Sequence, residues 1–267
     1  MTPSDMSLYE VFRRCRPLIV YICAGDPSPD ETVDIADRIV RAGADVLELG
    51  LPHSDPIADG PVIQAASQRA IAAGMNTDLY FDVASKIDGV PKVFMGYYNM
   101  VYRRGLERFV SDCRASGICG MIVPDLPMEE SRPLREVTSR HGVDLINMIA
   151  PNTPDKRIRD IVSTSSGFVY LVARSGVTGA RADLQESTKH LVERVPPVIP
   201  RAVGFGVSRP EHAAELVRAG ADGVIVGSAC VDLIGKKELD QLEDLIRSMK
   251  KAISEVSVKS AASIHQS

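Results

Sequence analysis

Short apolar segments alternate with longer amphipathic segments along almost the whole chain. The amphipathic segments, such as DETVDIADRIVRAG and EHAAELVRAG, carry apolar residues at helical spacing. The apolar segments are continuous rather than alternating, which is typical of parallel strands covered on both faces. Eight of them have the length of a strand: residues 18–23, 46–50, 92–96, 121–123, 143–149, 168–172, 198–203 and 223–226.

Helix-start signals and internal sequence repeats accompany this alternation. Ser28 and Ser208 each begin an S-x-x-E sequence with a proline nearby, so each is predicted to cap a helix. The segments RAGADVLELG (41–50) and RAGADGVIVG (218–227) share a helix end, a glycine turn and a strand, and residues 114–123 form a looser copy. Each has the short αβ loop of a β/α repeat.

These repeats favour one closed α/β barrel, a (β/α)8 or TIM barrel, over an open doubly wound sheet. We expect one domain over residues 1–267, with the barrel core at about 18–235, an extra N-terminal helix and a C-terminal helix at about 237–255. The final residues, SVKSAASIHQS, are expected to fray. No linker or change in composition marks a second domain, and single barrels commonly reach this length.

Charge and cysteine content exclude several classes of function. The formal net charge is −4 and no block of Lys and Arg stands out, so nucleic acid and anionic membranes are not expected partners. The apolar run near the N-terminus is too short to span a bilayer and lacks a signal-peptide layout. The five scattered cysteines form no C-x-x-C pair and are expected to be small buried residues in a reducing cytoplasm.

Three acidic residues follow one another at the second predicted strand, in ELGLPHSDPIADGP. In a barrel the chemistry lies at the carboxyl ends of the strands. If Leu47 and Leu49 face the helices, Glu48 points into the barrel mouth, where an apolar setting would raise its pKa and let it transfer protons. The alternative is a buried Glu48 paired with a Lys or Arg. Asp55 and Asp59 are either turn residues beside proline and glycine or a source of a second carboxylate over the pocket.

Glycine-rich loops follow the last three predicted strands. RSGVTGAR follows the sixth strand, GFGVSRPEH the seventh and VGSACV the eighth. Backbone N–H groups at helix N-termini bind phosphate, and glycine lets the ligand approach closely. One such loop is usually only a turn, but three in consecutive βα loops indicate a phosphate site. The residues alone therefore indicate a barrel enzyme with acid–base carboxylates that acts on a small phosphorylated molecule, and they do not name the reaction.

The run LELGLPHSDPIADGPVIQAAS, together with YLVARSGVTGAR, GFGVS and VGSACV, closely resembles the tryptophan synthase α-subunit family. The resemblance runs in order from about Leu18 to Leu233 and covers nearly every βα loop. It implies a lyase of tryptophan biosynthesis that cleaves indole-3-glycerol phosphate to indole and glyceraldehyde 3-phosphate by a retro-aldol reaction. Glu48 would then be the general acid–base residue, and Asp59 would hold the indole N–H and stabilise positive charge.

The resemblance also implies how the rest of the substrate is bound. The phosphate would be held by the backbone of Gly179, Gly206, Gly227 and Ser228. The apolar pocket for the indole ring, or else the core beneath it, would be formed by Tyr21, Met95, Ile122, Tyr170 and Phe205. Arg174 and Thr178 belong to the loop that closes over the substrate in the family, with Thr178 approaching Asp59.

The family forms an α2β2 complex with a separate pyridoxal-phosphate β subunit, which receives indole through a tunnel. The α chain itself would hold no cofactor and no metal. His53 departs from the phenylalanine usual in this loop, which faces the β subunit.

Three other functions remain open at this point. A stand-alone indole-glycerol-phosphate lyase would have the same carboxylates and no partner. A mainly allosteric binding subunit is disfavoured because Glu48 and Asp59 are both intact. Another phosphosugar isomerase or aldolase would need a Lys or His at a strand end, and the predicted strand ends offer neither.

Overall fold

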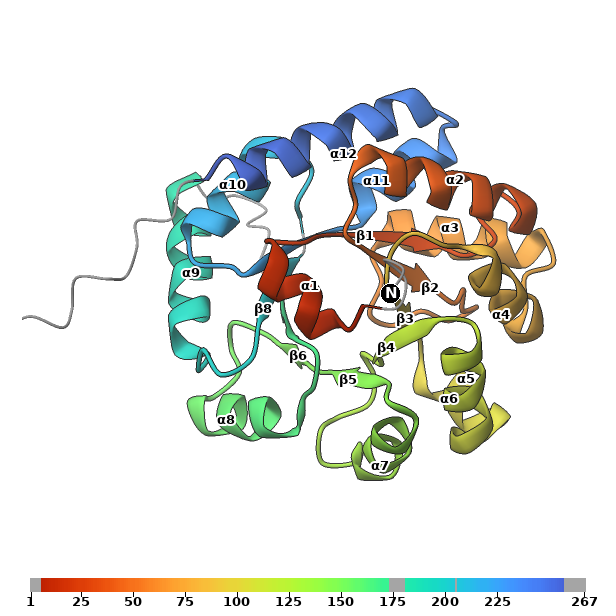
Figure 1. Ribbon diagram of the computed structural model, residues 1–267, viewed down its shortest axis with the longest axis horizontal. Coiled ribbons are helices and arrows are strands. Elements are labelled where there is room, and N and C mark those ends of the chain that lie inside the picture. The colour runs from red at the N-terminus through yellow and green to blue at the C-terminus, as the bar shows by residue number, and fades with distance from the viewer. Residues whose placement is uncertain (1–5, 173–180, 205, 257–267) are drawn as a thin grey trace, which may run out of the picture.

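A barrel of parallel strands surrounded by helices forms the centre of the molecule (Figure 1). The computed structural model describes residues 6–172, 181–204 and 206–256, excepting the side chains of residues 181–185 and 187. Within these ranges the strands are β1 (Leu18–Cys23), β2 (Val46–Gly50), β3 (Lys92–Met95), β4 (Ile118–Ile122), β5 (Asp144–Ile146), β6 (Met148–Ile149), β7 (Val169–Val172), β8 (Arg201–Gly204) and β9 (Gly223–Val226). The helices are α1 (Leu8–Arg14), α2 (Pro29–Ala42), α3 (Pro61–Ala72), α4 (Thr77–Lys86), α5 (Tyr98–Arg104), α6 (Leu106–Ala115), α7 (Arg132–His141), α8 (Asp155–Thr164), α9 (Arg181–Arg194), α10 (Pro210–Arg218), α11 (Ser228–Gly235) and α12 (Leu239–Ser254). The predicted TIM-barrel fold with an extra N-terminal helix is confirmed.

The fifth barrel strand changes its partner halfway along. Its first part, β5, pairs with β4 and ends with Ile146 opposite Ile122. Its second part, β6, begins at Met148 and pairs with β7 instead. The segment 143–149, predicted as one strand, is therefore two short strands separated by Asn147. This change of partner joins the two ends of the sheet order β5-β4-β3-β2-β1-β9-β8-β7-β6 into a barrel.

Alternate residues of each strand face opposite sides of the barrel wall. In β2, Leu47 and Leu49 pack in the layer between the strands and the outer helices, whereas Val46 lies in the barrel interior. Glu48 has the same parity as Val46 and therefore points inward. Helix α1 lies across the end of the barrel in Figure 1, and its buried Leu8 belongs to the interior cluster. The amino end of the barrel is thus closed, and the carboxyl end of the strands is left for a site.

Two strands, β4 and β8, begin three residues away from their predicted starts. β4 starts at Ile118 rather than residue 121, because Gly117 (φ 77°) already ends the preceding helix, and Gly120 lies inside the strand. A glycine within a strand weakens the sequence pattern that marks it. β8 starts at Arg201 rather than residue 198, because the prolines of VPPVIP cannot donate to a strand ladder and Val198 is 79% exposed.

One predicted helix cap is confirmed and one is wrong. The Ser28 hydroxyl accepts a hydrogen bond from the Glu31 N–H (3.3 Å) and donates one to the Glu31 carboxylate (2.7 Å). Helix α10, however, is capped by Arg209 and not by Ser208. Pro210 occupies its first turn, and the residue before a proline is driven into extended geometry, here φ −143° and ψ 153°. In α2 the proline directly follows the serine, so the cap falls on Ser28.

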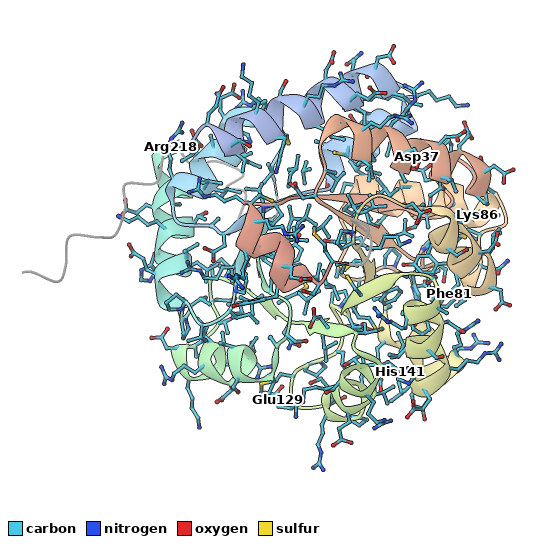
Figure 2. The ribbon with its side chains drawn as sticks, viewed as in Figure 1. Asp37, Phe81, Lys86, Glu129, His141 and Arg218 are labelled. Carbon is cyan, nitrogen blue, oxygen red and sulfur yellow. The ribbon has the colours of Figure 1, made fainter. Side chains whose placement is uncertain are left out.

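Charged side chains lie on the outside of the helical ring. Figure 2 shows Asp37, Lys86 and Arg218 at the periphery of the molecule, on α2, α4 and α10. Along the described residues, no helix has the length and apolar character needed to cross a membrane. All five cysteines are free thiols, and four of them are buried. The terminal segment expected to fray, residues 257–267, lies outside the described residues.

Candidate active site

A cavity of about 630 Å³ opens at the carboxyl ends of the strands. Its acidic side chains are those of Glu48, Asp59 and Asp232, and no Lys, Arg or His is among the described residues that line it. Most of the remaining wall is apolar. The lining residues are Tyr21, Glu48, Ala58, Asp59, Val62, Ile63, Met95, Pro124, Met148, Tyr170, Gly206, Val207, Ser208, Ile225, Gly227, Ser228, Ala229 and Asp232.

Glu48 is buried in the cavity wall without a partner. The residue is 2% exposed, and its Oε2 atom has no hydrogen-bond partner among the described residues. Burial, with a smaller contribution from the negative charge of Asp59, raises the pKa of Glu48 to about 8. No lysine or arginine of the described chain pairs with Glu48, so the structure does not support the ion-paired alternative. A carboxyl group in this state carries a proton at neutral pH and can release it.

Asp59 is held in place by the hydroxyl of Tyr97, at the end of β3. This hydroxyl accepts a hydrogen bond from the Ala58 N–H (2.9 Å) and donates one to the Asp59 Oδ2 atom (3.0 Å). Burial raises the pKa of Asp59, and the hydrogen bond from Tyr97 opposes part of this rise. Asp59 is thus better able than Glu48 to remain ionised, because donors stabilise its charge.

The loop before Asp59 is fixed by local hydrogen bonds. The Nδ1 atom of His53 accepts the Asp55 N–H (3.0 Å), so its Nε2–H donates to the Asn99 side-chain oxygen (3.1 Å). The His53 ring packs on Tyr97, with 4.9 Å between the ring centroids. The Asp55 side chain is exposed, accepts a bond from the Ser54 hydroxyl (2.6 Å) and does not line the cavity. Asp55 therefore acts as a turn residue, and Asp59 is the loop acid that lines the cavity.

Backbone groups of the last two strand–helix connections form another part of the wall. Helix α11 begins at Ser228 directly after β9, with Gly227 as its N-cap and no side-chain cap. The first N–H groups of a helix lack intrahelical partners and favour anions. A Cβ atom at Gly227 would lie 3.4 Å from the Cβ of Tyr21, at the cavity wall. Gly206, with φ 73°, lines the same cavity from the β8–α10 connection.

The structure brings together most of the predicted site residues that it describes. Those that line the cavity are Glu48, Asp59, Gly206, Gly227, Ser228, Tyr21, Met95 and Tyr170. Ile122 is fully buried in the barrel interior and is not among the lining residues. Gly179, Phe205, Arg174 and Thr178 lie outside the described residues.

Sequence reasoning missed three residues that matter for the geometry. Tyr97 holds Asp59, and its only signal was its place just after the third predicted strand. Met148 lines the cavity although it was predicted only as part of a strand. Asp232 projects from α11, and its Oδ2 atom accepts a hydrogen bond from the Lys236 Nζ atom (2.6 Å). In the sequence, this i,i+4 pair is indistinguishable from a pair on a solvated helix face. No group of three His, Cys, Asp or Glu side chains placed for a metal ion occurs in the part of the chain that the structure describes.

The sequence was compared with protein families and with individual relatives. Residues 12–262 match the family model described as tryptophan synthase alpha chain. The tryptophan synthase alpha chain of Methanosarcina barkeri is 51% identical over 243 residues, which covers 90% of this chain and 92% of the relative. The chain belongs to the tryptophan synthase alpha chain family. The identification made from the sequence motifs is thereby confirmed.

Solved structures of the same family share the fold. Tryptophan synthase subunit alpha from Legionella pneumophila superposes with a TM-score of 0.85 at 34% identity, covering 96% of this chain and 100% of that one. A chain from the tryptophan synthase a2b2 complex of Pyrococcus furiosus gives a TM-score of 0.82 at 37% identity, covering 87% and 97%.

Proposed function

We propose that this chain is the α subunit of a tryptophan synthase and cleaves indole-3-glycerol phosphate to indole and glyceraldehyde 3-phosphate. The observation that carries the proposal is the pair of unlike carboxyl groups in one apolar cavity. Glu48 is buried, its Oε2 atom has no partner among the described residues, and it holds a proton, whereas Asp59 is stabilised as an anion by Tyr97. Two carboxyl groups with different environments can divide acid–base and charge-stabilising roles between them.

The reaction breaks the bond between the indole ring carbon and the glycerol chain. In this mechanism Glu48 gives its proton to that ring carbon, and Asp59 accepts the indole N–H and stabilises the resulting cation. Glu48, now ionised, takes the proton of the adjacent glycerol hydroxyl as the carbon–carbon bond breaks and its electrons return to the ring. The products are indole and an aldehyde, and Glu48 ends the cycle protonated as it began.

The phosphate site is proposed to be built from backbone N–H groups. Gly206, Gly227 and Ser228 line the cavity, and no cationic side chain is among the described lining residues. The assignment of Gly179 to this site, and of Arg174 and Thr178 to a loop that closes over the substrate, depends on the sequence motifs alone.

The partner is a tryptophan synthase β subunit, and the expected assembly is α2β2. As the resemblance implies, pyridoxal phosphate would be held by that partner, and the acid–base chemistry proposed here uses only side chains of this chain. We also propose a cytoplasmic location, which the five free thiols support.

Two of the alternative functions are weakened by the site. A Schiff-base aldolase needs a lysine at a strand end, but Lys92, the one lysine in the described strands, starts β3 at the opposite end of the barrel. Its ammonium group is buried and donates to the carbonyls of Ala84 (2.7 Å) and Ile87 (2.5 Å). A purely allosteric subunit would not require an unpartnered buried carboxyl group, which is costly to maintain.

An assay of indole release from indole-3-glycerol phosphate, with and without a β subunit, tests the function. Glu48→Gln should lower the rate about 10²–10⁴-fold, since general acid–base catalysis is typically worth that much. Binding of glycerol phosphate by this variant should be unchanged. Asp59→Asn should also lose activity in the isolated chain, whereas Asp55→Asn, which alters an acid of the same loop outside the cavity, should retain it. Near-normal turnover by Glu48→Gln would remove Glu48 from the mechanism.

A further inference from the structure

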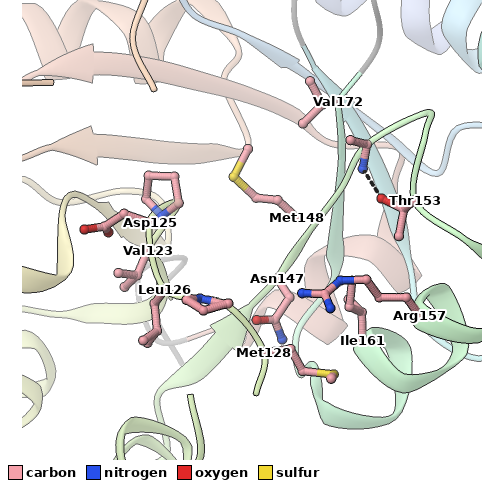
Figure 3. A pocket seen from close by; sticks show the side chains of 13 residues that line it. Val123, Asp125, Leu126, Met128, Asn147, Met148, Thr153, Arg157, Ile161 and Val172 are labelled. Carbon is pink, nitrogen blue, oxygen red and sulfur yellow. Dashed lines mark hydrogen bonds between the residues drawn. The ribbon is translucent and has the colours of Figure 1, made fainter. Parts of the chain in front are cut away.

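A second chamber lies beside the substrate cavity at the same end of the barrel. It has a volume of about 310 Å³ and is bounded by the β4–α7 connection, the β6–α8 connection and helix α8 (Figure 3). Its lining residues are Val123, Pro124, Asp125, Leu126, Pro127, Met128, Asn147, Met148, Ala150, Thr153, Arg157, Ile161 and Val172.

The chamber exists because the fifth strand changes its partner. Ile146 is the last residue of that strand to pair with β4, opposite Ile122. From Met148 onward the strand pairs with β7. The chain that continues from β4 and the chain that continues from β6 therefore separate, and the chamber occupies the space between them.

Met148 and Pro124 are the only described residues that line both the chamber and the substrate cavity, so they lie between the two spaces. Neighbouring residues of a strand point to opposite sides. Asn147 points outward, where its side-chain N–H donates to the Ser165 hydroxyl (2.9 Å), and Met148 packs with the barrel-interior cluster. Figure 3 shows the Met148 side chain extending away from Asn147 and Arg157. Pro124 is rigid, whereas methionine is unbranched and flexible, so Met148 is the adaptable part of the partition.

The partition faces the ring end of the substrate. The backbone groups proposed to hold the phosphate come from the connections after β8 and β9. The apolar wall formed by Met95, Pro124 and Met148 comes instead from the end of β3, the connection after β4 and the start of β6. In the sheet order, β1 and β2 separate β3 and β4 from β8 and β9. The phosphate would lie at one side of the cavity, and the carboxyl groups of β2 and its loop lie between that side and the apolar wall. The indole ring would therefore contact the apolar wall.

We propose that Met148 is a specificity-determining residue, which separates the substrate cavity from the chamber and so limits the size of substituent that the indole ring can carry. This inference rests on the function proposed above. Arg157 is held in the chamber wall by Glu129, with 2.9 Å between its Nη2 atom and the Glu129 Oε2 atom. The chamber's other charged lining residue, Asp125, is exposed and accepts a hydrogen bond from the Tyr98 N–H (2.9 Å). Because both charges have partners, the chamber suits an uncharged substituent of a few heavy atoms.

Shortening Met148 tests the proposal. Met148→Ala and Met148→Val should join the two spaces. Four indole-3-glycerol phosphates carry one bromine on the benzene ring. For at least one of them, kcat/KM relative to the unsubstituted substrate should be higher in the variants than in the parent. The ratio of kcat/KM values should change about 10–200-fold, the range by which a hydrophobic pocket discriminates small groups. Two matched controls exist, because Met95 lines only the substrate cavity and Met128 only the chamber. Neither Met95→Ala nor Met128→Ala should produce this change for the same substrate.

Binding measured in a Glu48→Gln background separates recognition from turnover, and the gain should appear there as a lower Kd for that brominated substrate. The proposal is overturned if both Met148 variants cleave the unsubstituted substrate but keep the parent's preference against every brominated one. It is also overturned if Met95→Ala gives the same gain. If the parent releases no indole from the unsubstituted substrate at all, with or without a β subunit, the proposed function fails first and this inference falls with it.

Discussion

Two buried carboxyl groups of this protein, those of Asp26 and Glu48, are held in opposite ways. Asp26 accepts two hydrogen bonds from Arg69, at 2.7 and 2.8 Å, and this pair ties the β1–α2 connection to α3. No cation of the described residues pairs with Glu48, and its pKa is raised to about 8 by burial. An unpaired buried carboxyl group is destabilising, and such costs are commonly kept where function requires them.

The pH dependence of catalysis follows from the two carboxyl groups of the cavity. Glu48 must be protonated to act as the acid, so kcat/KM should fall as the pH rises through about 8. Asp59 must be ionised, so kcat/KM should also fall at acid pH, and this limb should lie above the usual range for aspartate because the pKa of Asp59 is raised. Measuring kcat/KM from pH 4 to 10 checks both limbs. An alkaline limb that persists in the residual activity of Glu48→Gln would have to come from another group.

The same carboxyl group should make stability depend on pH. Because the folded pKa of Glu48 is about 8 and its ordinary value is 4.5, the folded state holds an extra proton between these values. Stability is therefore lost as the pH rises from about 4.5 to 8. Glu48→Gln removes this loss, so its free energy of unfolding relative to the parent should increase over that interval, by on the order of a few kcal/mol. Urea unfolding at several pH values would measure it, with the exposed Glu130→Gln as a control that should run parallel to the parent.

At the scale of elements, two helices that begin with a glycine N-cap allow a matched test of the phosphate site. Gly227 caps α11 and lines the cavity, whereas Gly60 caps α3 and has open space around it. Gly227→Ala should place a methyl group beside Tyr21 and hinder the approach of the ligand to the backbone. Loss of one charge-assisted hydrogen bond is worth about 1.5–3 kcal/mol, so the Kd for glycerol phosphate should rise about tenfold or more. Gly60→Ala should bind as the parent does, and equal affinities in all three proteins would move the phosphate elsewhere.

At the scale of the whole molecule, the two ends of the barrel have different tasks. Helix α1 closes the amino end, and the carboxyl end carries the cavity together with exposed apolar side chains. Ile57, in the loop before Asp59, is 81% exposed, and Tyr102, on α5 after β3, is 68% exposed. Exposed apolar side chains beside a site are typical of a surface that meets a partner.

The exposed tyrosines give a paired test of the β-subunit surface. Tyr102→Asp should weaken binding of a β subunit about tenfold or more, since buried aromatic anchors carry much of an interface's binding energy. Tyr9→Asp makes the same change on α1, at the closed end, where Tyr9 is 57% exposed, and should leave that affinity unaltered. Glycerol phosphate binding should be the same in both variants. Equal effects of the two substitutions on the Kd for the β subunit would place the interface elsewhere.

Local pattern was sufficient for the barrel and for part of the site. The predicted bounds of β1, β2 and β9 agree with the structure because continuous apolar runs between glycine turns are a property of adjacent residues. The parity that turns Glu48 inward is equally local, since it depends only on the two-residue repeat of a strand. The glycines after the last strands likewise identify the strand–helix connections from adjacent residues alone.

What depends on neighbours distant in the sequence was decided only by the tertiary structure. Asn147 divides a strand because β4 and β7 compete for the two sides of one segment, and one polar residue in an apolar run does not show which strand each half pairs with. Tyr97 was not distinguished from Tyr98 until folding placed its hydroxyl against a loop residue 38 positions away. Met148 acquires its place between two spaces for the same reason. A side chain's periodicity is set by its own backbone, but its partners are set by the packing of segments that the chain brings together only when it folds.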